Sequence, residues 1–252
     1  MNKADRSRHY QDRVRKAIAK PRLQDTLHRF ADAYVMAREA AFAGQDFEAL
    51  RTAIGEMKDE VRDNLPRYRD QFIANAEAAG AKVHIARTAA EANDYICNLA
   101  KQRGVKTVVK SKSMASEETH LNTALEKAGV KAVETDLGEW IIQLAGERPS
   151  HMVMPAIHML KEEVAELFSK VTGKEEPAEI LHLVRLARGQ LRQAYLDADM
   201  GITGANVAVA ETGGIALVTN EGNARLTSTL PKIHVALVGM EKLVPTLADA
   251  NR

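Results

Sequence analysis

Residues 104–144 read GVKTVVKSKSMASEETHLNTALEKAGVKAVETDLGEWIIQL, and this stretch decides the fold class. Residues 106–110 are rich in β-branched side chains, which predicts a short buried strand. A helix is expected over residues 116–128, a second strand over residues 130–133 and a second helix over residues 137–144. Short strands that alternate with helices of this length predict βαβ units and a largely parallel sheet.

The same alternation continues toward the carboxyl terminus. Further strands are predicted at residues 152–154, 206–210, 215–219 and 233–238, and the last is apolar enough to be expected at the centre of the sheet. Two of these strands flank Glu211-Thr-Gly-Gly214, where paired glycines permit a tight hairpin turn. Because parallel crossovers are right-handed, helices are expected on both faces of an open sheet.

The first eighty residues carry a different pattern. Leu23, Leu27 and Phe30 begin an apolar stripe at three- and four-residue spacing, which is typical of one helix face. We therefore predict a helical segment over residues 1–80 and an α/β domain over residues 81–252. An apolar stripe must be buried somewhere, so a homodimer formed through these helices is one reading of the pattern.

The composition argues against several classes of function. Lys and Arg number 35 against 34 Asp and Glu, and a formal net charge of +1 gives no broad basic field for nucleic-acid phosphates. No stretch reaches the roughly 20 apolar residues that cross a bilayer. Residues 1–20 are charged throughout, unlike a signal peptide. We expect a cytoplasmic protein without a membrane span and without a nucleic-acid partner.

The residues that usually bind metals and cofactors are sparse. Cys97 is the only cysteine, so the chain forms no internal disulfide and cannot supply the four thiolates of an iron–sulfur cluster. His151 and His158 have no cysteine or carboxylate at metal-ligand spacing, which favours a structural role. No Gly-x-Gly-x-x-Gly follows a strand, so nothing indicates a nicotinamide site. We expect no metal and no cofactor in this chain.

The first candidate site follows the strand at residues 106–110. Ligands in open α/β sheets bind beyond the carboxyl ends of the strands. Backbone amides at the next helix N-terminus favour an anion there, and two lysines would add charge. The alternative is a solvated loop in which Ser116 caps the helix. The candidate ligand-binding residues are Lys110, Ser111, Lys112 and Ser113.

The second candidate is Glu134, in the acidic stretch Glu134-Thr-Asp136 after the next strand. Asp136 is well placed to cap the following helix. Glu134 has no such duty, so its carboxylate is a candidate to hydrogen-bond a ligand hydroxyl.

The third candidate combines glycines with polar side chains. Residues 201–206 and 210–214 contain glycines that let backbone approach a ligand, and a second acidic glycine turn follows at residues 219–223. We expect these turns to line one cleft together with Lys110. The alternative is a set of exposed turns. The candidate residues are Glu211, as a catalytic carboxylate, and Thr203, Asn206, Thr212, Gly213, Asn220, Glu221, Gly222 and Asn223 as ligand-binding groups.

Several of these blocks resemble the lactate-utilisation (LUD) domain family. They are Lys110-Ser-Lys-Ser-Met114, Glu134-Thr-Asp136, Arg148-Pro-Ser-His151, Gly201-Ile-Thr-Gly-Ala-Asn206, Ala210-Glu-Thr-Gly213, Thr219-Asn-Glu-Gly-Asn223 and Leu230-Pro-Lys-Ile-His234. The similarity covers about residues 30 to 250, and several blocks in order are much harder to match by chance than one motif.

The resemblance implies a fold like the ribose-phosphate isomerase and coenzyme A transferase group. It also implies a domain of an iron–sulfur electron-transfer subunit that oxidises L-lactate to pyruvate with other subunits of the lactate-utilisation system. Relatives of this type continue into a ferredoxin-like region that binds [4Fe–4S] clusters, and we expect the present chain to lack that region. Its own role would be to bind a small anionic ligand or a partner subunit.

The same fold group supplies an alternative function. In related coenzyme A transferases a glutamate beside a glycine turn attacks a thioester, and Glu211 stands in a similar setting. A coenzyme A transferase-like or sugar-phosphate enzyme that uses Glu211 is therefore the second hypothesis. The turn Glu211-Thr-Gly-Gly214 lacks the asparagine of the transferases, which weighs against it.

Overall fold

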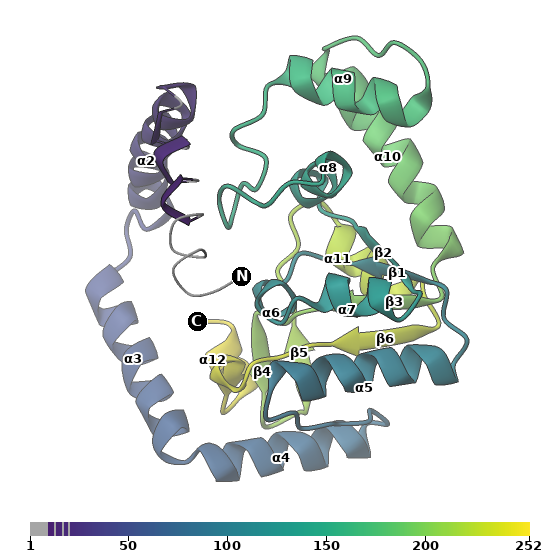
Figure 1. Ribbon diagram of the computed structural model, residues 1–252. Coiled ribbons are helices and arrows are strands. Elements are labelled where there is room, and N and C mark those ends of the chain that lie inside the picture. Colours follow the sequence, from purple (N-terminus) through teal and green to yellow (C-terminus); the bar gives the residue numbers. More distant parts are fainter. Residues whose placement is uncertain (1–9, 13, 17, 20) are drawn as a thin grey trace.

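The computed structural model describes residues 10–252 apart from residues 13, 17 and 20 (Figure 1). The helical segment predicted over residues 1–80 therefore lies partly outside the described residues. From residue 21 onward this segment forms α2 (Pro21–Ala41), α3 (Phe47–Asp63) and α4 (Leu65–Ala78).

The central sheet contains four parallel strands in the order β2-β1-β3-β6. Their bounds are Thr107–Lys110 for β1, Lys131–Glu134 for β2, Met200–Thr203 for β3 and Ile233–Ala236 for β6. Lys110 is opposite Glu134 on one side and Ile202 on the other. The predicted α/β class with a parallel sheet is confirmed, and the strands end together at the edge where α6 and α8 begin (Figure 1).

Helices cover both faces of this sheet because consecutive strand residues point to opposite sides. Val108 packs in a core with residues of α5 (Ala89–Gln102) and α7 (Leu121–Lys127). Val109 packs on the other face, in a core with Trp140 and Phe168. That second core is built from α8 (Leu137–Ala145), α9 (Lys161–Thr172) and α10 (Ile180–Asp197).

Strand β3 differs from the prediction, which treated Gly201 as part of a ligand-binding turn. Gly201 is buried in the strand, and a Cβ there would lie 1.8 Å from the Thr227 carbonyl oxygen. Thr227 belongs to α11 (Asn223–Thr229), which therefore packs directly on the β3 backbone. The glycine serves helix–strand contact.

Two other expected strands are placed differently. Strand β6 is an edge strand of the sheet rather than a central one. Residues 152–154 form no strand and lie in the irregular loop between α8 and α9.

A second, smaller sheet has the order β5-β4-β7. Strands β4 (Val207–Val209) and β5 (Gly214–Ala216) form the predicted antiparallel hairpin, and β7 (Leu243–Val244) runs parallel to β4. Gly213 has φ +68°, and a Cβ there would lie 2.1 Å from the Ala76 amide nitrogen. A glycine is needed at this turn because the end of α4 presses against it.

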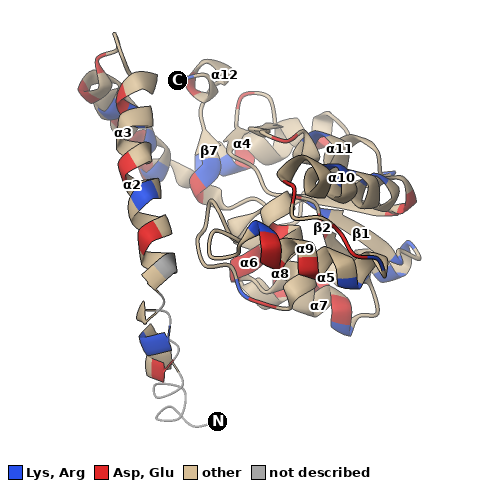
Figure 2. Cartoon of the chain, turned by 90° about the horizontal axis from the view of Figure 1, so that it is seen from above, with Lys and Arg blue, Asp and Glu red and all other residues tan. Residues whose placement is uncertain are grey.

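Helices α3 and α4 pack against the small sheet. Val61 of α3 and Tyr68 of α4 pack in one core with Ala208 of β4, and Lys58 Nζ donates hydrogen bonds to the carbonyls of Glu241 and Leu243. Helix α2 stands apart from the sheets, and Figure 2 shows basic and acidic residues mixed along α2 and α3. Two short helices flank β7 in the last part of the chain. They are the 3₁₀ helix η1 (Met240–Lys242) and the α-helix α12 (Leu247–Ala250).

Among the described residues, no helix combines the length and apolar character that crossing a membrane would require.

Candidate functional site

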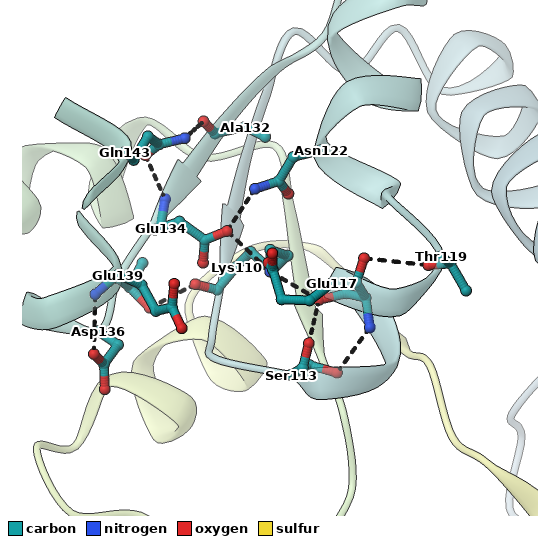
Figure 3. Close-up of polar contacts among 12 residues, drawn as sticks. Lys110, Ser113, Glu117, Thr119, Asn122, Ala132, Glu134, Asp136, Glu139 and Gln143 are labelled. Atoms are coloured by element: carbon teal, nitrogen blue, oxygen red, sulfur yellow. Dashed lines mark hydrogen bonds and ion pairs between the residues drawn. The ribbon is translucent and has the colours of Figure 1, made fainter. Parts of the chain in front are cut away.

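The candidate site begins with an ion pair between the last residues of two neighbouring strands. Lys110 ends β1 and Glu134 ends β2, and because they are opposite in the parallel register their side chains leave the same face of the sheet. Lys110 Nζ lies 2.9 Å from Glu134 Oε1 (Figure 3). Lys110 is 1% exposed and Glu134 is 3% exposed. A buried lysine at a strand end is the central feature of the site.

Helix α6 (Met114–Glu118) supplies two further contacts to Lys110. Lys110 Nζ donates to Ser116 Oγ at 2.8 Å and lies 3.1 Å from Glu117 Oε1. Ser113 is the N-cap of this helix and accepts a hydrogen bond from the Ser116 amide. The predicted cap was Ser116, which instead turns inward to the lysine.

The predicted helix over residues 116–128 is also interrupted. His120 has φ +55° and separates α6 from α7. The break lets α6 lie across the strand end while α7 packs on the sheet, so that both reach the ion pair.

The charge of Lys110 is maintained by its neighbours. Burial by itself lowers the pKa of a lysine because it penalises the charged form. The carboxylates of Glu134 and Glu117 outweigh this effect and hold the pKa of Lys110 above its ordinary value. Lys110 is therefore a cation in the folded protein, and two carboxylates already neutralise it.

Three buried polar atoms near the ion pair have no hydrogen-bond partner among the described residues. They are Glu134 Oε2, Asn122 Oδ1 and Ser111 Oγ. Asn122 comes from α7, and its amide nitrogen donates to Glu134 Oε1 at 2.6 Å. Most buried polar groups in proteins are hydrogen-bonded, so several unpaired atoms around one strand end mark a place for a polar ligand or water.

Glu139, in the first turn of α8, faces this group of residues. Asp136 caps the helix by accepting hydrogen bonds from the amides of Gly138 and Glu139, as predicted. The Glu139 side chain is 6% exposed. Burial and the negative charges of Glu134 and Glu117 raise its pKa to about 7. We call Lys110, Glu117, Asn122, Glu134 and Glu139 the strand-end cluster.

Lys112 stands at the rim of the strand-end cluster. Its Nζ donates to the Val153 carbonyl at 2.6 Å, and among the described residues it forms no ion pair. Glu221 reaches the same rim, where its Oε2 accepts a long hydrogen bond from the Leu137 amide at 3.3 Å. Three loops, those after β1, β2 and β5, therefore meet above the cluster.

The loop between α8 and α9 is held by its histidines. His158 is hydrogen-bonded to Ser150 Oγ at 2.7 Å and to Glu147 Oε2 at 2.8 Å. His151 Nδ1 accepts from the amides of Val153 and Met154. These contacts fix the backbone that carries the Val153 carbonyl, which agrees with the structural role expected for both histidines.

The chemistry open to the strand-end cluster is hydrogen bonding and proton exchange. No group of three or more His, Cys, Asp or Glu side chains suited to a metal ion occurs among the described residues. The cluster instead combines a charged lysine, an uncharged amide and carboxyl groups, one of which titrates near neutral pH.

Comparison with known proteins identifies the family. A family model described as LUD domain matches residues 69–252. The chain belongs to the LUD domain family.

Curated proteins similar to this LUD domain include several named for lactate utilisation. A protein named lactate utilization protein B from Anoxybacillus flavithermus is 47% identical over 216 residues, which cover 84% of this chain and 45% of the relative. The protein of the same name from Bacillus subtilis is 43% identical over 212 residues, or 84% and 44% of the two chains. An Escherichia coli protein named uncharacterized electron transport protein YkgF is 42% identical over 205 residues, or 81% and 43%.

The LUD domain chain thus spans less than half the length of these relatives. No solved structure matches it. The family match begins inside α4.

The LUD domain brings many of the predicted site residues together. Ser113 touches the β3 end, since a Cβ on Gly204 would lie 2.8 Å from Ser113 Oγ. Thr203 is buried and hydrogen-bonded to His234 Nε2 at 2.9 Å. Six of the predicted site residues lie at or next to the ends of β1, β2 and β3. They are Lys110, Ser111, Lys112, Ser113, Glu134 and Thr203.

Predicted residues after β3 have mainly structural contacts. Asn206 Oδ1 accepts from the Val218 amide, and Gly222 is the left-handed N-cap of α11. Glu221 joins the rim, as described above. Asn220 precedes it in the same bend and Asn223 begins α11.

Glu211, Thr212 and Gly213 are placed elsewhere. They form the turn at the opposite end of β4 from Asn206, where Asn75 of α4 donates to the Glu211 carbonyl. The Glu211 carboxylate accepts a hydrogen bond from the Leu247 amide at the start of α12. The structure does not bring this turn to Lys110.

Sequence reasoning did not select Glu117, Asn122 or Glu139 as site residues. Glu117 and Glu139 occur in the first turns of helices, where acidic residues are common for the helix dipole alone. Asn122 is one polar residue on a helix surface. Only the strand register, which places Lys110 beside Glu134, gives these three residues a common centre.

Proposed function

We propose that this chain is the ligand-binding LUD module of a lactate-utilisation protein, and that the strand-end cluster binds a small hydroxy- or oxo-carboxylate such as L-lactate or pyruvate. The observation that carries the proposal is the buried Lys110–Glu134 pair surrounded by unpaired polar atoms at the carboxyl ends of parallel strands. This is the edge at which ligands bind in open α/β sheets.

The choice of ligand class follows from the relatives and from charge. Relatives that are 47% and 43% identical bear the name lactate utilization protein B. Lys110 is already neutralised, whereas Lys112 is held only by a neutral carbonyl. In our proposal the carboxylate of either ligand binds Lys112, and the hydroxyl of L-lactate, which pyruvate lacks, also donates to the unpaired Glu134 Oε2.

The wider role belongs to the same proposal. We place the module in an iron–sulfur electron-transfer protein that works with other subunits in L-lactate oxidation. Any [4Fe–4S] cluster would be bound by a region other than residues 1–252, because Cys97 is the only cysteine. The work of the present chain is then to hold and orient the ligand.

Binding of L-lactate and pyruvate to the purified chain tests the proposal by isothermal titration calorimetry. We expect saturable binding of the wild type, and at least tenfold weaker binding by Lys112→Gln because a hydrogen bond to a charged group contributes about 1.5–3 kcal/mol. Lys82→Gln is the matched control, since Lys82 is an exposed lysine outside the site. Absence of binding by the wild type, or equal affinities of the two variants, would contradict the proposal.

A further inference from the structure

One carboxyl group of the strand-end cluster has no partner. Glu139 is 6% exposed, and its carboxyl oxygens form no hydrogen bond or ion pair within the described part of the chain. The charged form of a buried carboxylate is costly unless water or a cation compensates it, and Lys110 and Lys112 compensate Glu139 only in part. Glu139 is therefore poised to hold a proton or to receive a partner.

The charges that face Glu139 come from three neighbouring parts of the fold. Glu134 approaches from β2 and Glu117 from α6, while Lys110 and Lys112 approach from the end of β1 and the loop after it. On its own helix, Asp136 is committed to capping backbone amides. Lys110 forms ion pairs with both Glu134 and Glu117, and Lys112 is held by the Val153 carbonyl, so an ionised Glu139 adds a negative charge without an ion pair among the described residues.

We propose that a carboxylate ligand enters the strand-end cluster together with one proton, which is carried by Glu139. This inference rests on the proposed function and specifies how the same site accepts its ligand. The incoming carboxylate would meet the uncompensated charge of an ionised Glu139. A neutral Glu139 removes that repulsion and offers an O–H donor to the ligand or to Glu134 Oε2.

The pH dependence of ligand binding follows from the pKa of Glu139 in the protein without ligand. Burial and the neighbouring carboxylates already raise its pKa to about 7, and a bound anion raises that pKa further. Below pH 7 the proton is present before binding, so affinity changes little. Above pH 7 each ligand must bring a proton, and affinity falls about tenfold per pH unit.

Calorimetric titration of the intact chain with L-lactate in buffers of different ionisation enthalpy measures the proton uptake. We expect about half a proton per ligand at pH 7 and nearly one at pH 8.5, with Kd rising about tenfold between pH 7.5 and 8.5. Glu139→Gln should bind without proton uptake and with a Kd that hardly changes with pH. Glu118→Gln, an exposed acid of α6, is the control and should behave like the wild type.

The outcomes separate the two proposals. Wild-type binding with no proton uptake and a constant Kd overturns the inference and leaves the ligand site intact. Proton uptake that persists in Glu139→Gln overturns the assignment to Glu139. Absence of L-lactate binding at every pH overturns the proposed function, and the inference with it. Circular dichroism of each variant shows whether it is folded before it is titrated.

Discussion

Lys110 Nζ lies 2.9 Å from Glu134 Oε1, and the two residues occupy matching positions at the ends of adjacent parallel strands. The pair is thus fixed by the backbone register as well as by its charges. Asn122 and Ser116 each hold one partner from outside the sheet. Such a pair is rigid, so ligand groups can bind beside it without rearrangement of its side chains.

Removing one member of this pair should be strongly destabilising. Lys110→Met leaves Glu134 as a buried charge without a cation, and we expect the free energy of unfolding to fall by about 3–5 kcal/mol in urea denaturation. The double variant Lys110→Met/Glu134→Leu should recover most of that loss. Arg51→Met, which breaks the exposed pair with Glu48, should cost less than about 1 kcal/mol. Equal losses for the buried and exposed changes would contradict the burial described here.

Glu139 should make stability depend on pH. Its pKa is about 7 in the folded chain and near 4.5 when unfolded, so the folded state holds more protons between these values. The contribution of Glu139 to the free energy of unfolding is therefore greatest below pH 4.5. That contribution falls as the pH rises from 4.5 through 7, by about 3 kcal/mol in total. Urea denaturation of the wild type and of Glu139→Gln at pH 5 and pH 8 measures this contribution, as the difference between their free energies of unfolding at each pH. A difference that does not change with pH would show that Glu139 is not perturbed.

Two glycine substitutions should have opposite effects. Gly201→Ala places a Cβ 1.8 Å from the Thr227 carbonyl oxygen, so α11 must move away from β3, and we expect a loss above about 2 kcal/mol. Gly189 lies exposed inside α10 with nothing within 4 Å of a Cβ, so Gly189→Ala should stabilise by about 0.5–1 kcal/mol. Thermal unfolding of both proteins makes the comparison, and a neutral Gly201→Ala would mean that this helix–strand contact is looser than described.

Glu211 should contribute to stability rather than to ligand binding. Its carboxylate accepts the Leu247 amide at 2.9 Å, so Glu211→Ala should lower the free energy of unfolding by about 1 kcal/mol, as the loss of a helix cap does. Glu211→Gln keeps an acceptor oxygen and should be nearly neutral. L-lactate binding should be the same in all three proteins. Loss of binding in a stable Glu211→Gln variant would return this residue to the site.

The alternation of strands and helices could be predicted from sequence because it depends on local patterns. Residues 106–110 contain three β-branched side chains and residues 130–133 contain two, each segment comes shortly after a glycine, and they form β1 and β2. The lateral order of the strands is not local. Residues 233–238 are mostly apolar, yet β6 is an edge strand, because the order depends on how each crossover passes over the sheet.

The site was only partly predictable for a related reason. Lys110 was expected to offer charge to an anion, but the register places Glu134 beside it and burial commits the two to each other. Gly201 was expected in a turn where a glycine lets the backbone approach a ligand. Nothing in the neighbouring sequence reveals that Thr227 lies against it.

The position of β3 has a consequence for synthesis of the chain. β1 can pair with β2 soon after both leave the ribosome, but its other neighbour, which pairs Lys110 with Ile202, is made roughly ninety residues later. At usual translation speeds this delay is on the order of ten seconds. Until then β1 has no strand partner on that side. The sheet that positions Lys110 and Glu134 therefore cannot be completed before β3 and β6 have been synthesised.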